Sequence, residues 1–106
     1  MNERDRETLS RMLLFAERVQ MRVDGLKLED FLDNLEKQYA IGQVGECANT
    51  ISEQTREDYS NILWNPIIGI RNRVFHSYED IDMTVVFETA LLHIPQLIQQ
   101  LREILD

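Results

Sequence analysis

Apolar residues recur every three or four positions along most of the chain, which is the spacing that one face of an α-helix produces. Residues 3–23 show this stripe first, in Leu9, Met12, Ala16, Val19 and Val23. The longest run comes near the end, in Met83, Phe87, Ala90, Ile94, Leu97, Leu101 and Ile104. No stretch shows the strict alternation of a strand, so the pattern predicts an all-α chain.

Capping residues and changes of helical phase predict where the first elements end. Asp24-Gly25 follows the first helix, and glycine suits a left-handed C-terminal cap. Residues 28–33 predict a short helical turn. The apolar positions then change face near Asp33-Asn34, so a new helix is expected over 34–53. Residues 54–63 are polar and predict a loop.

Two later helices are predicted from their first residues. Asn65 is a good N-cap and Pro66 fits a first helical position, so a helix is expected from Pro66 to about His76. Asp82 is a plausible cap for the last helix. Pro95 lies inside that helix, where it predicts a kink or a short break just before it.

These elements predict a single domain over residues 1–106. Its expected architecture is an up-down antiparallel helical bundle of four main helices plus a short one, with a kinked last helix. Gly42, Gly45 and Ala48 are small enough to let another helix approach closely. The last helix and this small-residue patch leave apolar surface that one small bundle does not cover, so we expect a homodimer.

Composition limits the function classes. The net charge is −8, which disfavours nucleic acid on bulk electrostatics. The charge is uneven, however, and Arg4, Arg11, Arg18 and Arg22 follow one line on the first helix. That row is either a solvated flank or a basic surface for RNA or an acidic partner. An anion site would therefore have to be local.

Other classes find little support in the sequence. One cysteine, Cys47, excludes a disulfide framework, and no apolar run approaches a membrane span. A cytoplasmic location follows as the default. Two histidines and one cysteine, not at ligand spacing, make a metal site unexpected, and no cofactor motif is present.

Residues 65–78 are where useful polar groups enter an apolar pattern. Arg71 can bind a phosphate with two hydrogen bonds, and His76 can transfer a proton near neutral pH. Tyr78 offers a hydroxyl that can be modified. Arginine and histidine together suffice to cleave RNA without a metal. The histidine takes the proton of the ribose 2′-OH, and the arginine stabilises charge on phosphorus.

Helical geometry opposes this site within one chain. Arg71 and His76 are about 140° apart on a regular helix. They converge only if the helix unwinds near His76 or if a second subunit completes the pocket. The competing interpretation is structural, with Arg71 in a salt bridge and His76 at the helix C-terminus. Glu46 is either a surface carboxylate or the partner of an arginine inside the domain.

The segment from Trp64 to Tyr78 resembles the signature of the HepT-like proteins, a branch of the HEPN superfamily. That signature is an arginine, four to six residues, a histidine, one residue and a tyrosine, and Asn72 fits the residue after the arginine. Residues 40–48 are similar to the family's second helix, and residues 80–95 to its acidic turn and final helix. Ser77 stands where glycine is common and Cys47 where alanine is common.

The resemblance implies a dimeric HEPN bundle that acts as the toxin of a type II toxin–antitoxin pair. Its activity would be a metal-independent endoribonuclease with the active site at the dimer interface. Arg71 would bind phosphate, His76 would be the general acid and base, and Asn72 would support the motif. The partner would be an MNT-type nucleotidyltransferase antitoxin that transfers AMP to Tyr78.

Two other functions stay open at this point. The chain could be a non-catalytic HEPN-type binding subunit of a nucleotidyltransferase complex, which its acidic charge favours. It could also be a helical dimer whose motif is only structural.

Overall fold

The computed structural model describes residues 1–76 and 80–106, and the side chains of residues 1–75 and 83–106. Within these residues every regular element is an α-helix, and no strand occurs. The helices are α1 (Glu3–Val23), α2 (Leu28–Leu32), α3 (Leu35–Thr50), α4 (Glu53–Asp58), α5 (Trp64–His76) and α6 (Asp80–Leu105). The predicted all-α class is confirmed.

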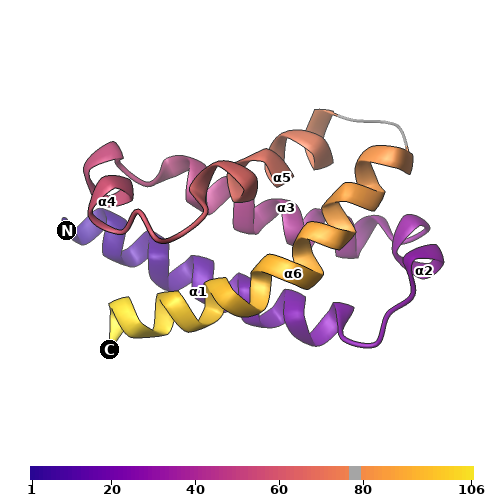
Figure 1. Cartoon of the computed structure of the whole chain (residues 1–106), viewed down its shortest axis with the longest axis horizontal. Helices are drawn as coiled ribbons and strands as arrows, with labels where there is room; N and C mark the ends of the chain where they lie inside the picture. Colours follow the sequence, from indigo (N-terminus) through magenta and orange to yellow (C-terminus); the bar gives the residue numbers. More distant parts are fainter. Residues whose placement is uncertain (77–79) are drawn as a thin grey trace.

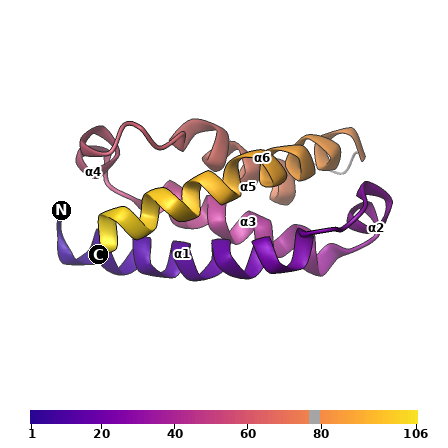
Figure 2. The ribbon, with the colours of Figure 1, turned by 60° about the horizontal axis from the view of Figure 1, so that its bottom comes forward.

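The four long helices α1, α3, α5 and α6 run in alternating directions along the molecule (Figure 1). α1 packs against α3 and α6, and α5 packs against the same two helices from the other side. Both termini lie at one end of the molecule and α2 lies at the other end, as Figures 1 and 2 both show. This is the predicted up-down antiparallel bundle.

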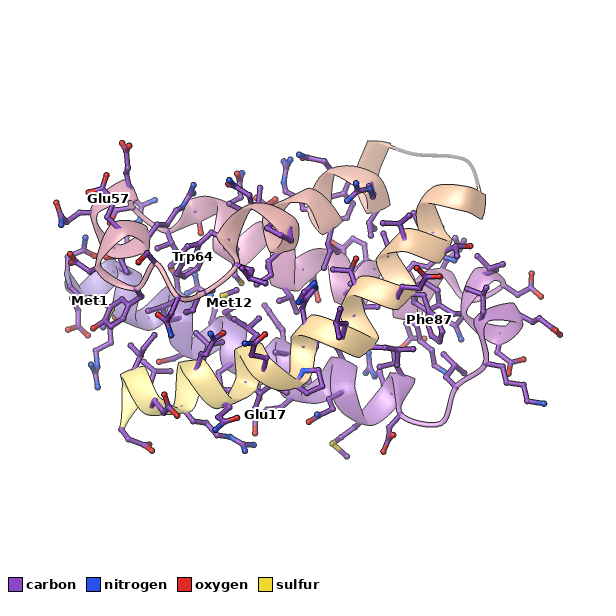
Figure 3. The ribbon with its side chains drawn as sticks, in the orientation of Figure 1. Met1, Met12, Glu17, Glu57, Trp64 and Phe87 are labelled. Atoms are coloured by element: carbon purple, nitrogen blue, oxygen red, sulfur yellow. The ribbon has the colours of Figure 1, made fainter. Side chains whose placement is uncertain are left out.

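The core extends along the length of the bundle. The apolar stripe predicted for α1 is buried in full, and Ile67 and Ile70 of α5 are buried with it. Figure 3 shows Met12 and Trp64 toward one end of the molecule and Phe87 toward the other. None of the helices in the described residues is long and apolar enough to cross a lipid bilayer.

α2 closes one end of the bundle. The side chain of Phe31 is fully buried, and its ring centroid lies 4.9 Å from that of Phe87 in α6. The side chain of Asn34 accepts a hydrogen bond from the Lys37 backbone N–H at 3.0 Å, which caps α3. Gln38 Nε2 donates to the Phe31 carbonyl at 2.9 Å, so the end of α2 is satisfied as well. The predicted break near Asp33-Asn34 is confirmed.

The loop predicted at 54–63 is wrong in its first half, which forms α4. α3 ends at Thr50 and not at residue 53, and the side chain of Ser52 accepts from the Thr55 N–H to cap α4. Of the α4 residues only Thr55 is buried. Periodicity therefore gave no sign of this helix, and a serine followed by an acidic first turn was the available signal.

Asp5 of α1 fixes α4 to the bundle. Its carboxylate accepts hydrogen bonds from the hydroxyl of Ser52, from the Ser52 backbone N–H at 3.2 Å and from Thr55 Oγ1 at 2.6 Å. The residue is 2% exposed. Because a buried carboxylate is stable only when its oxygens are hydrogen-bonded, this cluster holds the position of α4.

The predicted start of α5 is two residues late. α5 begins at Trp64, so Asn65 is its second residue and is not the N-cap. The indole of Trp64 is buried, and its N–H donates to the Tyr59 carbonyl at 3.1 Å. Pro66 still lies in the first turn, where its missing N–H leaves no hydrogen bond broken.

The predicted start of the last helix is also wrong. α6 begins at Asp80, so Asp82 is its third residue and not its cap. Pro95 lies inside α6, yet the helix continues without interruption to Leu105. A short break is therefore not what Pro95 produces, and a kink within the continuous helix stays a prediction.

Candidate functional site

Two glycines of α3 let α5 lie close against it. A Cβ on Gly45 would meet the Ile67 carbonyl oxygen at 2.7 Å and the Arg71 backbone nitrogen at 2.8 Å. A Cβ on Gly42 would meet side-chain atoms of Val74 at 3.0 Å. Since neither glycine has a side chain, α5 approaches α3 at the level of Arg71. The close approach predicted from these small residues is confirmed.

Arg71 is held by two side chains. Its Nε forms an ion pair with Glu46 of α3, and its Nη1 donates to Asn72 Oδ1 at 2.9 Å. A guanidinium has five N–H bonds. These two contacts therefore leave three N–H bonds without a partner among the described residues. The side chain is 28% exposed, so it is half-buried and oriented but still accessible.

The ion pair decides between two interpretations of Glu46. The carboxylate pairs with an arginine inside the domain, and it is not only a helix-surface group. The Glu46 side chain is 45% exposed, and an ion pair so open to solvent contributes only about 0–1 kcal/mol to stability. The pair therefore matters more for the direction of the guanidinium than for the free energy of folding.

The other predicted site residues lie at the edge of what the structure describes. α5 stays helical up to His76, its last residue, so the helix does not unwind before that position. The side chain of His76 and the whole of Tyr78 lie outside the described residues. The structure thus brings Arg71 and Asn72 together, and the approach of His76 and Tyr78 to them stays a prediction.

A groove of about 270 Å³ lies over α3, between α1 and α5. Glu46, the partner of Arg71, forms part of its lining, together with Gln43, Cys47 and Phe75. Arg11 of α1 and Tyr39 of α3 also line it. Sequence reasoning missed Tyr39, Gln43 and Phe75. The available signal was that Gln43 and Tyr39 lie about one and two helical turns before Glu46, on the same helix.

Cys47 is a buried thiol of low reactivity. The side chain is buried, and burial raises the pKa of the thiol above its ordinary value. The nearby positive charge of Arg11 opposes this rise, whereas Glu46 adds to it. The thiol is therefore protonated at neutral pH and is a poor nucleophile.

The described residues contain no group of three or more His, Cys, Asp or Glu side chains placed to hold a metal ion. The chemical resources of the site are thus a guanidinium held between a carboxylate and an amide, and a groove with aromatic and amide side chains beside it. The guanidinium suits a phosphate, and the aromatic side chains beside it suit a planar ring attached to that phosphate.

Comparison with known proteins identifies the family of this chain. Residues 11–104 match the family described as "Ribonuclease HepT-like". The chain is 32% identical to a protein of Caldanaerobacter subterraneus subsp. tengcongensis named "Putative RNase". The alignment of 89 residues covers 80% of each of the two chains. It is 29% identical over 84 residues to a "Putative RNase" of Methanocaldococcus jannaschii, covering 76% of this chain and 69% of that one.

A third relative is the "Probable ribonuclease HepT" of Thermococcus cleftensis, 27% identical over 73 residues, which cover 65% of this chain and 66% of the relative. No solved structure matches the chain. The family match covers α3 and α5 in full and most of α1 and α6, and it includes the segment from Arg71 to Tyr78. The chain belongs to the HepT-like ribonuclease family.

Proposed function

We propose that the protein is a metal-independent endoribonuclease whose active site contains Arg71, His76 and Asn72. The observation that supports this most directly is the fixed guanidinium of Arg71. Glu46 and Asn72 each take one of its N–H bonds, and the other three have no partner among the described residues and can bind a phosphate. An arginine oriented in advance stabilises developing charge without reorganising during the reaction.

The proposed reaction is a transesterification within RNA. His76 takes the proton from a ribose 2′-OH, and the 2′ oxygen attacks the adjacent phosphorus. The bond to the 5′ oxygen breaks, and that oxygen leaves with a proton supplied by a general acid. The products are a 2′,3′-cyclic phosphate and a 5′-hydroxyl. Arg71 stabilises the negative charge on the pentacoordinate phosphorus.

The proposed active site needs two copies of the chain. Because α5 remains helical up to His76, unwinding before that residue is not available to bring the two side chains together. A partner subunit that completes the pocket is the alternative. Exposed Met21, Leu35 and Leu92 show that the isolated chain leaves large apolar side chains open to solvent, which supports a homodimer.

We further propose that the protein is the toxin of a type II toxin–antitoxin pair. Its partner would be an MNT-type nucleotidyltransferase that transfers AMP from ATP to the Tyr78 hydroxyl and releases pyrophosphate. A bulky, charged group two residues from His76 would block RNA. Intact-mass measurement after co-expression, with Tyr78→Phe as control, detects this adduct.

The decisive experiment is RNA cleavage by purified protein free of AMP, in the presence of a chelator. We expect cleavage by the wild type and a loss of about 100- to 1,000-fold in rate for Arg71→Ala, as for the removal of a transition-state donor elsewhere. Arg102→Ala is a matched control, because it also removes an arginine from an ion pair, here with Glu17 across α1 and α6 at 2.8 Å.

If the AMP-free wild type cuts no RNA, or if His76→Ala cuts as fast as the wild type, the proposal is wrong. A loss of activity in Arg102→Ala as large as in Arg71→Ala would mean that the assay reports stability and not the site.

Two observations favour a second function. The ion pair with Glu46 gives Arg71 a structural partner, and the net charge of −8 does not attract RNA from a distance. Both suit a non-catalytic HEPN-type subunit that binds a nucleotidyltransferase. A stable complex with neither nuclease activity nor AMP on Tyr78 would support this alternative.

A further inference from the structure

We propose that the groove over α3 binds one unpaired base of the RNA, stacked on Tyr39 and read by Gln43, with Arg11 contacting a neighbouring phosphate. This inference rests on the proposed function, because it gives the ribonuclease a subsite beside its reacting phosphate.

The aromatic side chains are the first reason. Tyr39 of α3 is 56% exposed, so much of its ring is open to solvent. Its ring centroid lies 5.6 Å from that of Phe75 in an edge-on arrangement, so the two rings support each other across α3 and α5. Exposed aromatic rings are the platforms on which proteins stack single-stranded bases.

The position of the groove is the second reason. Phe75 lies one helical turn after Arg71 on α5, so the two side chains project on the same side of that helix. Glu46 both pairs with Arg71 and lines the groove. A nucleotide whose phosphate meets Arg71 therefore has its neighbouring base within reach of the groove.

Size and polarity are the third reason. The groove is about 270 Å³, just below the range of about 300–1,000 Å³ typical of sites for small molecules, which suits one base. Gln43 and Thr50 in its lining offer amide and hydroxyl groups that can bond to base edges. These groups can give the enzyme a preference among bases.

Charge selects the class of ligand. Arg11 and Glu46 both line the groove, and Arg71 of α5 pairs with Glu46. Because Glu46 pairs with Arg71, the three side chains together carry one net positive charge, which suits a single phosphate but does not attract polyanions from afar. We therefore expect an interaction in which stacking contributes much of the affinity and few phosphates are contacted.

The experiment measures binding of a short single-stranded RNA that carries 2′-O-methyl groups and so cannot be cleaved. Tyr39→Leu removes the ring but keeps an apolar side chain, and we expect about 5- to 150-fold weaker binding, the range of one lost stacking contact. Tyr39→Phe keeps the ring and should restore most of the affinity. Leu63→Ala, an exposed apolar change just before α5, should alter binding less than about two-fold.

Salt dependence tests the role of Arg11. Each phosphate contact on a single strand contributes about −0.7 to the slope of log affinity against log salt concentration. Arg11→Gln should therefore reduce the slope by about 0.7, and Tyr39→Leu should leave it unchanged. Crosslinking with 5-bromouridine RNA and mass spectrometry should place the adduct on Tyr39 or Phe75.

The outcomes separate this inference from the proposed function. If the wild type cleaves RNA and Tyr39→Leu binds and cleaves equally well, the base site is wrong and the ribonuclease stands. If the wild type binds RNA through Tyr39 but never cleaves, the base site stands and the ribonuclease is wrong. If Tyr39→Leu changes the oligomeric state without an RNA crosslink in the groove, a second copy occupies it and the inference is overturned.

Discussion

Two carboxylates, Asp5 and Glu46, each connect two helices of this bundle, but they do so in opposite surroundings. Asp5 is buried and accepts hydrogen bonds from neutral donors of Ser52 and Thr55. Glu46 is half exposed and pairs with the guanidinium of Arg71. A buried carboxylate whose oxygens all accept hydrogen bonds stabilises the fold. A solvent-exposed carboxylate that orients a guanidinium contributes little to stability, so it can serve a functional site instead.

Replacing Asp5 should give the largest effect on stability. Asp5→Ala leaves the N–H of Ser52 and the hydroxyls of Ser52 and Thr55 without their acceptor, and we expect a loss of about 2–3 kcal/mol in the free energy of unfolding. In a domain of this size that lowers Tm by about 10–20 °C. Urea denaturation measures the loss, and Glu7→Ala, an exposed change on the same helix, is the control. A loss below about 0.5 kcal/mol would mean that the Asp5 cluster is not structural.

The glycines of α3 give the next largest effect, and they test how Glu46 is placed opposite Arg71. In Gly45→Ala the new methyl meets backbone atoms of α5, which cannot move alone, so we expect a net loss of about 1–2 kcal/mol. Gly42→Ala meets side chains that can shift by a few tenths of an ångström, and alanine also favours the helix by about 1 kcal/mol. It should therefore stay within about 1 kcal/mol of wild type. Equal losses in urea denaturation would contradict this difference.

The pH dependence of stability should show a smaller effect from the Asp5 cluster. Burial alone would raise the pKa of Asp5, but hydrogen bonds from Ser52 and Thr55 and the charge of Arg4 together lower it below its ordinary value of 3.8. The contribution to stability is thus complete above about pH 4 and disappears as the pH falls through the lowered pKa. The difference in unfolding free energy between wild type and Asp5→Asn should shrink from pH 5 to pH 2. A constant difference would contradict the assigned pKa direction.

The same comparison explains what could be predicted from the sequence. The long helices and the buried stripe of α1 follow from a repeating pattern, because periodic burial acts on many residues at once. The Asp5 cluster could not be predicted, because Ser52 and Thr55 lie 47 and 50 positions after Asp5 in the sequence. The helix α4 that it fixes has Thr55 as its only buried residue and so shows no apolar pattern. The helix start at Trp64 was missed because Trp64 is buried, and its packing overrides the capping preference of Asn65. The start at Asp80 differs from the predicted one by about two residues, the usual variation at helix ends.

The residues of the candidate site also fall into those that the sequence predicted and those that it did not. Arg71 and Asn72 could be named because a short motif marks them. Glu46 was recognised as an open question, since a lone carboxylate in a small-residue patch does not specify its partner. Tyr39 and Phe75 were missed because their contact depends on how closely α5 lies against α3, and the sequence does not specify that distance.

Glu46→Gln should have the smallest effect on stability and tests the comparison most sharply. It removes the charge of a half-exposed ion pair, so we expect a change within about 0.5 kcal/mol. Cleavage should nevertheless slow by about tenfold, because a neutral amide holds the guanidinium less firmly and one tenfold loss corresponds to about 1.4 kcal/mol of transition-state stabilisation. Glu36→Gln is the matched control, since it weakens the more exposed pair with Arg22 and should change neither quantity.

The two measurements on Glu46→Gln can disagree with this account in different ways. If the variant loses as much stability as Asp5→Ala, Glu46 is a structural carboxylate and the contrast between the two groups disappears. If stability and cleavage both stay at wild-type values, the ion pair does not orient Arg71 for the reaction. Only unchanged unfolding with slower cleavage, together with an unchanged KM, identifies Glu46 as a positioning residue that acts through the guanidinium in the transition state.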